Sequence, residues 1–267
     1  MDYLSYFVYG LIQGITEFIP ISSTAHLKIV SLVFGINDPG SSLSAIIQLG
    51  SVFAILFYFR RDYQVLNSLR RVSIFRNIYS MRLLNSIILG TLSILICGLI
   101  IKVFFPYYSD SFLRSNLSIG FFSILMGFIL LIADNSRKKI FSIKDHSYLS
   151  SFLIGIAQSF AIIPGVSRSG VTISAALLLG WKKDDAAKFS FLLGIPAITF
   201  SAFSELLDFN RNQILTSLGP LLVGLITAFI VSLLSIDFFL RFIRVNGLKI
   251  FSYYRFVFGS LILISYF

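Results

Sequence analysis

The chain has 267 residues, of which 56% are hydrophobic and only 13% are charged, and its mean hydropathy is +0.87. Apolar runs close to membrane-spanning length recur from end to end, which excludes an ordinary soluble domain and indicates an integral membrane protein. The formal net charge of +10 could indicate nucleic-acid binding. Basic residues gathered in a few loops are instead the usual orientation signal of membrane proteins, so we expect no nucleic acid among the partners.

Eight apolar segments predict helices that lie in or across the membrane. In chain order they cover residues 4–34, 42–59, 83–104, 117–134, 149–180, 189–207, 217–240 and 254–267. The first and the fifth are too long for one ordinary span, and proline interrupts each near its middle, at Pro20 and at Pro164. Because two half-length helices joined by a turn can enter and leave on the same side, we expect a re-entrant hairpin in each.

Basic residues favour one set of the predicted loops. The loops 60–82, 135–148, 181–188 and 241–255 hold seventeen arginines and lysines, whereas 36–41, 105–116 and 208–216 hold only two. The positive-inside rule places the first set in the cytoplasm. This assignment agrees with the order of the segments only if 149–180 returns to the side that it left, as a hairpin does. His146 lies in one of these charged loops, where we expect it to be solvated.

A shift of 145 residues aligns the first half of the chain with the second. The identical pairs are few for an apolar sequence: Gly10 with Gly155, Gln13 with Gln158, Ser22 with Ser167, Leu32 with Leu177 and Gly35 with Gly180. The order of segments adds support, because each half is a hairpin followed by three spans. Since three is odd, the second half is inserted upside down, and the two hairpins enter from opposite faces.

We therefore predict an all-α integral membrane protein with about six transmembrane helices plus two re-entrant helical hairpins. The whole chain, 1–267, is expected to form a single membrane domain. Its two halves, about 1–140 and 145–267, form an inverted-topology repeat. Repeats of this kind commonly build a central site for a polar or charged ligand from their broken helices.

The two hairpin tips carry similar polar sequences, PISSTAH from Pro20 and PGVSRSG from Pro164. In each, serine leads into a new helix and can cap its free N–H groups, and a helix N-terminus favours an anion such as phosphate. Arg168 adds a planar, permanently charged group suited to phosphate oxygens. The alternative is structural, because such turns also end ordinary helices. This structural alternative is weaker for Arg168, because a charged side chain in lipid is energetically costly unless it faces water or a partner.

Glu17 is the natural partner of Arg168, either as a metal ligand or as a general acid/base. Gln13 lies one helical turn earlier on the same face and could add a carbonyl ligand. On the next helix, the imidazole of His26 could transfer protons or attack phosphorus, although a core histidine bonded to a carbonyl is the alternative. The single cysteine, Cys97, excludes a cysteine-based metal cluster. These residues predict a membrane protein that handles a phosphorylated ligand between two hairpins.

The stretches QGITEFIPISSTAH (13–26) and PGVSRSG (164–170) resemble the two signature motifs of the bacitracin-resistance family of undecaprenyl-diphosphatases. They stand in the family's order and spacing, and IQLGS (47–51) and FSFLLGIPA (189–197) extend the similarity over most of the chain. The resemblance implies a multi-pass protein of the bacterial cytoplasmic (inner) membrane. It would hydrolyse undecaprenyl diphosphate, a polyprenyl diphosphate lipid, to the monophosphate with a divalent cation, Mg²⁺ or Ca²⁺. The resemblance also leaves room for a homodimer.

The family's essential residues match Glu17, Ser23, His26 and Arg168 by position, and the attacking group is Ser23, His26 or a water. The resemblance places phosphate binding beside them, at Ser22, Thr24, Gly165, Ser167, Ser169 and Gly170, with Ser22 also expected to cap its helix. It assigns the metal to Glu17 and to Gln13, which stands where many members carry glutamate. Ala25 likewise replaces the family's usual glycine.

Two other functions stay open on the sequence. A carrier for a polyprenyl phosphate would use the same inverted repeat and the same Arg168, but it would need neither a nucleophile nor a proton donor. An inactive homologue is the third reading, because Gln13 and Ala25 depart from the motif. The group of Glu17, Ser23 and His26 favours the enzyme over both.

Overall fold

The computed structural model describes residues 3–35, 41–61, 77–105, 107–108, 111–136, 140–207 and 211–265. These residues form helices and their connections, without a β-strand beyond one isolated bridge between Phe141 and Trp181. The α-helices are α1 (Tyr3–Thr16), α2 (Ser23–Phe34), α3 (Ser41–Tyr58), α5 (Asn77–Phe104), α6 (Asn116–Asn135), α7 (Tyr148–Ser159), α8 (Arg168–Leu178), α9 (Lys183–Leu207), α10 (Arg211–Asn246) and α11 (Lys249–Ile264). Short 3-10 turns are η1 (Phe59–Arg61), η3 (Phe112–Arg114) and η4 (Phe160–Ile162). The predicted all-α class is confirmed.

Several of the helices are long and apolar enough to cross a membrane, which supports a multi-pass membrane protein. Four stretches of the described chain meet this test by length and composition: Met81–Phe104, Asn116–Asn135, Lys183–Glu205 and Leu218–Asn246. Leu43–Tyr58 and Tyr148–Ile162 are apolar but shorter. Helix α5 exposes large apolar side chains such as Ile88 and Leu99, as a helix facing lipid does. The count of about six spans stays a prediction.

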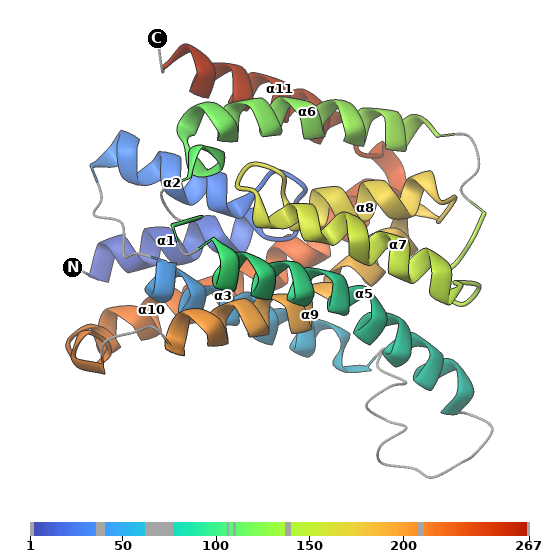
Figure 1. The fold of residues 1–267 in the computed structure, drawn as a ribbon, viewed down its shortest axis with the longest axis horizontal. Helices are drawn as coiled ribbons and strands as arrows, with labels where there is room; N and C mark the ends of the chain where they lie inside the picture. Colours follow the sequence, from blue (N-terminus) through green and yellow to red (C-terminus); the bar gives the residue numbers. More distant parts are fainter. Residues whose placement is uncertain are drawn as a thin grey trace.

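Both segments in which proline was expected to break the helix are broken. The first divides into α1 and α2, and the second divides into α7 with η4 and then α8. Figure 1 shows the long helices running in one general direction, with the α1–α2 pair at one end and the α7–α8 pair at the other. The turns of the two pairs face each other in the middle of the molecule. Half-length helices thus bring two irregular backbone segments to the centre.

Glycine allows each hairpin to pack closely on a long helix. Helix α1 packs on α10, and a side chain at Gly10 would collide with the carbonyl oxygen of Gly224. Helix α7 packs on α5 in the same way, with Gly155 against the backbone of Gly90. Gly10 and Gly155 are one of the pairs related by 145 residues. Small residues are typical where membrane helices cross. Lipid provides no hydrophobic driving force between the helices, so they associate through close packing of their backbones.

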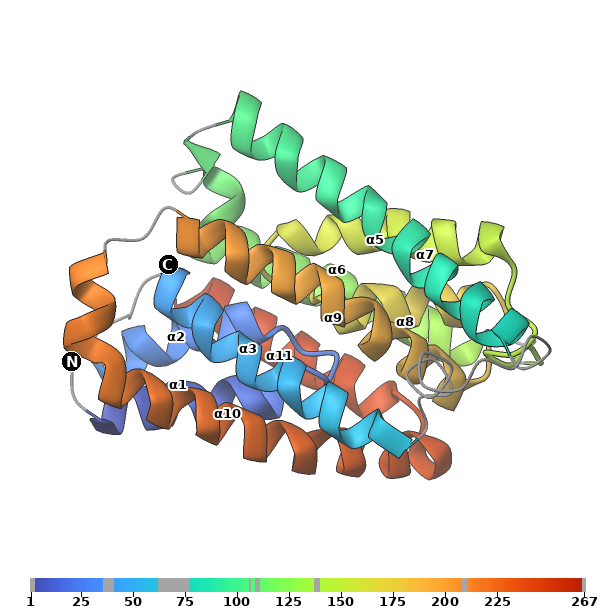
Figure 2. The same cartoon turned by 90° about the horizontal axis from the view of Figure 1, so that it is seen from below.

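The remaining helices surround these pairs. Helix α6 lies beside α11, and α3 packs against both α9 and α10, as the view from below shows (Figure 2). The largest buried apolar cluster joins the first turn to the long helices, with Phe18, Phe191 and Phe239 all fully buried. The core therefore holds the first turn from one side.

The helices extend beyond the apolar stretches of the sequence, so several residues expected in loops lie in helices. Helix α5 includes Arg82, and α10 includes Arg241 and Arg244. Once a helix is nucleated, each further residue adds a backbone hydrogen bond, so the helix can continue past the apolar stretch. The expectation that His146 is solvated was wrong. Only 1% of its surface is exposed, and its Nε2 lies 2.8 Å from the Ser86 hydroxyl. This burial lowers the pKa of His146.

Candidate active site

The first turn, residues 17–22, combines buried apolar side chains with the buried carboxylate of Glu17. Phe18 is fully buried and meets Phe191 edge-to-face at 5.0 Å between ring centroids. Ser22, which ends the turn, has a φ of +77°. This conformation costs a non-glycine residue about 1–3 kcal/mol, and it persists only where the surrounding structure imposes it. The core thus anchors a strained turn that begins with Glu17 and leads into Ser23 at the start of α2.

The second turn, residues 163–167, uses a similar backbone. Gly165 has a φ of +94°, and a side chain there would come within 2.7 Å of the Ile119 carbonyl oxygen. Ser167 has a φ of +71° and accepts a 3.2 Å hydrogen bond from the Gly170 N–H, so it caps α8 as predicted. Ser22 and Ser167 are the non-glycine residues with positive φ in the described chain, and they lie 145 positions apart.

The two turns are in direct contact. The Ser169 hydroxyl donates to the carbonyl of Ile19 at 3.3 Å and lies 3.3 Å from the Ser167 hydroxyl. Beside it, the Arg168 guanidinium forms a 3.0 Å ion pair with Glu17. The predicted pairing of Glu17 with Arg168 is therefore present in the structure, across 151 residues of sequence.

Glu17 is the centre of the polar cluster. Its Oε1 accepts from Arg168 Nη2, and its Oε2 accepts from both Ser23 Oγ and Gln13 Nε2, each at 2.8 Å. The side chain is 8% exposed. A serine hydroxyl that donates to a buried carboxylate has an acceptor for its proton within hydrogen-bond reach, as a nucleophile requires. Gln13, Glu17, Ser23 and Arg168 thus form one connected group.

Arg168 is held by α9 as well as by Glu17. Its Nη1 donates to the Ser190 carbonyl at 2.8 Å, and the guanidinium lies over Gly194, where any side chain would collide with it. Its Nε–H is buried and has no hydrogen-bond partner among the described residues. A planar group fixed on two sides with a donor to spare is suited to a phosphate oxygen.

His26 does not join this group through any hydrogen bond of the described residues. Its Nδ1 lies 2.8 Å from the Ser22 carbonyl oxygen, and its Nε2 lies 2.7 Å from the Tyr254 hydroxyl on α11. The expected alternative, a histidine bonded to a carbonyl, describes its Nδ1. Of the group Glu17, Ser23 and His26 that the sequence singled out, the first two are therefore joined by a hydrogen bond, whereas the His26 ring bonds to α11.

The remaining predicted phosphate-binding residues differ in their surroundings. Thr24 is exposed, whereas Ser169 and Gly170 are buried in the second turn. Ser22 is buried, but its side chain makes no capping bond, so the expectation that it caps α2 was wrong. Its carbonyl oxygen accepts from the backbone N–H of His26 at 3.2 Å, as the first bond of the helix.

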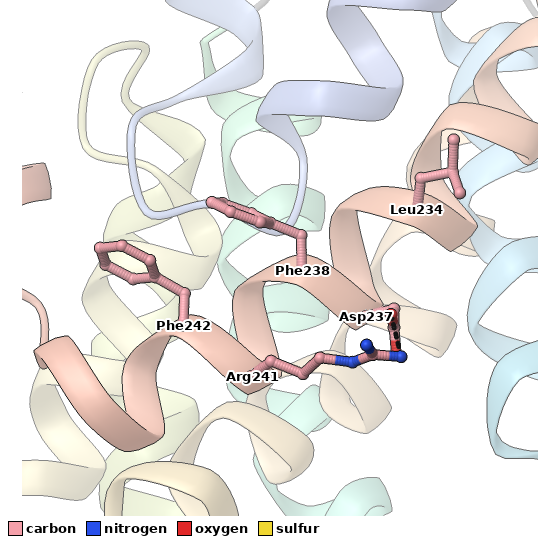
Figure 3. A pocket seen from close by; sticks show the side chains of 5 residues that line it. All are labelled: Leu234, Asp237, Phe238, Arg241 and Phe242. Atoms are coloured by element: carbon pink, nitrogen blue, oxygen red, sulfur yellow. Dashed lines mark ion pairs between the residues drawn. The ribbon is translucent and has the colours of Figure 1, made fainter.

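A separate hollow on the flank of α10 shares no residue with this cluster. Figure 3 shows that its lining comes from that helix alone, with the Asp237–Arg241 ion pair at one end. The Oδ2 of Asp237 lies 2.7 Å from the Arg241 guanidinium, which is 77% exposed. This hollow carries none of the predicted chemistry.

Comparison with known proteins matches residues 6–261 to the family described as "Bacitracin resistance protein BacA". This chain belongs to that family. It is 54% identical over 265 residues to the "Undecaprenyl-diphosphatase" of Prochlorococcus marinus (strain AS9601), covering 99% of this chain and 97% of the relative. A relative of the same name from Prochlorococcus marinus subsp. pastoris (strain CCMP1986 / NIES-2087 / MED4) is 56% identical over 268 residues, which cover 99% and 100% of the two chains.

In this BacA-family chain, sequence reasoning assigned Arg255 to a cytoplasmic loop, and this was wrong. Arg255 is 1% exposed in α11, and its guanidinium donates to backbone carbonyls of both turns, Pro20 at 3.0 Å and Val166 at 3.3 Å, and also to Gly165. It further bonds the Ser123 carbonyl at 3.1 Å. An arginine within a helix that is otherwise apolar was the available signal.

The charges around the two turns favour an anion. Glu17 is paired with Arg168, whereas Arg255 is bonded to carbonyl oxygens and brings a second positive charge. Two guanidinium groups and one carboxylate leave an excess of one positive charge beneath the hairpin tips. In surroundings of low dielectric constant this excess stabilises a negatively charged ligand.

A divalent cation fits part of this donor set. The Oε1 of Gln13 is buried next to the Glu17 carboxylate, and no residue in the described part of the chain bonds to it. No group of three or more histidine, cysteine, aspartate or glutamate side chains that could hold a metal occurs among the described residues. Mg²⁺ is commonly held by one or two protein oxygens together with substrate phosphates, and Glu17 with Gln13 meets that requirement.

Proposed function

We propose that this protein is an undecaprenyl-diphosphatase, which hydrolyses undecaprenyl diphosphate to undecaprenyl phosphate and inorganic phosphate. The family membership and the names of its relatives support the reaction. The observation that carries the proposal is the buried group in which the Ser23 hydroxyl and the Arg168 guanidinium both bond to Glu17. A nucleophile, a proton acceptor and a phosphate-binding cation are the parts that phosphoryl transfer needs.

In the proposed mechanism, the terminal phosphate of the substrate lies against Arg168 and the N-terminus of α8. The hydroxyl of Ser23, or a water in its place, attacks the terminal phosphorus, and Glu17 accepts the proton that this hydroxyl loses. The bond between that phosphorus and the bridging oxygen breaks, and undecaprenyl phosphate leaves. If Ser23 attacks, water then hydrolyses the phosphoserine. Arg168 offsets the charge on the phosphate oxygens, because this chemistry depends mostly on positioning and electrostatics.

Glu17 and Gln13 are the residues that we propose to hold a divalent cation, Mg²⁺ or Ca²⁺. A bound cation would neutralise charge on the phosphate oxygens. We propose that the phosphate is contacted by Ser22, Thr24, Gly165, Ser167, Ser169 and Gly170. Purified protein in detergent should lose activity with a chelator and regain it on addition of either cation; full activity in excess chelator would remove the cation from the mechanism.

Release of inorganic phosphate from undecaprenyl diphosphate by the purified protein tests the function directly. We expect turnover by the wild type. We expect none by either of two single variants, Ser23→Ala and Glu17→Gln. A polyprenyl phosphate carrier is the competing function, because two hairpins that meet in a membrane are also transporter architecture. A wild type that binds undecaprenyl phosphate but releases no phosphate from the diphosphate would favour the carrier, and one that does neither would favour an inactive homologue.

We also propose that the chain is one domain of the bacterial cytoplasmic (inner) membrane, in which the α1–α2 and α7–α8 hairpins are re-entrant and belong to inverted repeats of about 1–140 and 145–267. The equal spacing of the positive φ angles supports this, at Gly35 and Gly180 as at the two serines. In a Cys97→Ser background, Asp145→Cys and Lys182→Cys should label from the same side of the membrane, and Phe112→Cys from the other. Opposite labelling at 145 and 182 would make α7–α8 a complete crossing.

A further inference from the structure

The His26 imidazole is fixed in one tautomer by its two hydrogen-bond partners. The Ser22 carbonyl oxygen, 2.8 Å from Nδ1, can only accept, so Nδ1 carries a hydrogen. In the neutral ring, Nε2 is then the acceptor, and the Tyr254 hydroxyl at 2.7 Å donates to it. The Tyr254 hydroxyl therefore stabilises the tautomer that the Ser22 carbonyl selects.

Helix α11 also fixes the plane of the ring. The Phe258 ring stacks on the imidazole at 4.2 Å between centroids with 4° between the planes, and the Tyr254 ring lies nearly parallel at 5.7 Å. These contacts leave the imidazole little freedom to rotate. The direction in which its Nδ1–H points is thus determined by α11 and not by α2 alone.

The far end of this chain of hydrogen bonds is the first turn. His26 Nδ1 bonds the carbonyl of Ser22, the residue with a φ of +77°, and the next residue is Ser23, whose hydroxyl bonds Glu17 at 2.8 Å. A strained backbone persists only where several contacts impose it. The bond from His26 is one such contact, because the Ser22 side chain makes no capping bond of its own.

We infer that Tyr254 is a positioning residue for the phosphatase reaction. It acts through His26: the Tyr254 hydroxyl holds the Nδ1–H tautomer, and His26 in turn holds the Ser22 turn that keeps Ser23 on Glu17. This inference deepens the proposed function and rests on it. It places the role of His26 in holding the nucleophile's turn and adds α11 to the elements that build the site.

Enzyme kinetics with a matched pair of variants test the inference. Tyr254→Phe removes the hydroxyl and keeps the ring, and we expect kcat to fall about tenfold with KM unchanged, because the phosphate-binding groups are untouched. The control is Tyr253→Phe, the same change at the neighbouring residue, which is 56% exposed and whose ring contact is with Phe256. It should leave both constants as in the wild type. A normal kcat in Tyr254→Phe overturns the inference.

Nitrogen-15 NMR of histidine-labelled protein tests the contact without substrate. The chain has two histidines, and His146→Gln identifies which signals belong to His26. The wild type should show His26 neutral with its hydrogen on Nδ1, and Tyr254→Phe should shift the Nε2 resonance, whereas Tyr253→Phe should not. A wild-type His26 with its hydrogen on Nε2 overturns the inference whether or not Tyr254→Phe folds. If the wild type gives the expected spectra but releases no phosphate, the missing activity overturns the proposed function. The spectra would still support the Tyr254–His26 contact.

Discussion

The two hairpin turns share a backbone but carry different side chains. Each turns into its second helix through a serine with positive φ, Ser22 in the first and Ser167 in the second. In the second turn that serine caps its helix, and the next residue is the cation, Arg168. In the first turn the serine makes no capping bond, and the next residue is Ser23, which bonds Glu17.

This difference separates holding from chemistry. The second turn offers a capped helix N-terminus and a guanidinium, which suit the binding of phosphate. The first turn offers a carboxylate and a hydroxyl, which suit proton transfer and attack. Two turns of similar backbone thus carry different side chains, which meet at the Glu17–Arg168 ion pair. Variants that affect one turn and spare the other can break this comparison.

The largest effect is expected from Glu17→Gln. The amide cannot accept the proton of the Ser23 hydroxyl, and it leaves the buried Arg168 charge without its partner, so turnover should fall at least about a hundredfold. Glu205→Gln is the matched control, because these are the chain's two glutamates, and it should retain wild-type turnover. Phosphate release at a fixed cation concentration measures both. Substantial turnover by Glu17→Gln would remove the first turn from the chemistry.

The second turn is tested by Arg168→Lys. Lysine keeps the charge, but its donors share one nitrogen and cannot reproduce the planar guanidinium that reaches Glu17 and the Ser190 carbonyl from two nitrogens. We therefore expect kcat/KM to fall at least about tenfold, which is about 1.4 kcal/mol. Exposed Arg241→Lys serves as the control on α10. Near-normal kcat/KM in Arg168→Lys would show that a point charge is enough at this turn.

Gly194→Ala tests the position of Arg168 without changing the arginine. The added methyl group would occupy the place of the guanidinium, which must shift, and we expect activity to fall about fivefold. Gly98→Ala is the control, because a side chain at Gly98 would meet nothing within 4 Å. Equal activity in the two variants would mean that the guanidinium tolerates displacement.

The smallest effect concerns the two turn serines. Ser167→Ala removes the capping bond to the Gly170 N–H and should lower the free energy of unfolding by about 1 kcal/mol. Ser22→Ala removes no capping bond and should cost clearly less. Unfolding of the two variants in the same mixed detergent micelles compares them. A larger loss for Ser22→Ala would contradict the difference between the turns described above.

Much of the site could be predicted from the sequence because its residues are local to two short motifs. Glu17, Ser23 and Gln13 lie within eleven positions, and helical spacing alone puts Gln13 and Glu17 on one face. The pairing of Glu17 with Arg168 was also predictable, since a charge in an apolar segment needs a partner. The missing capping bond of Ser22 was not predictable, because the corresponding Ser167 has nearly the same φ and does cap its helix.

By itself the sequence determined the membrane class, the two broken helices and the polar residues at their tips, because composition, proline and hydropathy act locally. Only the tertiary structure decided the parts contributed from afar: Arg255 bonded to both turns, Gly194 beneath Arg168, and Tyr254 on His26. In each of these contacts the two residues are separated by between 26 and 235 positions of sequence. They follow from the way in which α9 and α11 pack against the hairpins. The sequence periodicity of either helix does not predict this packing, because packing depends on the shapes of both partners.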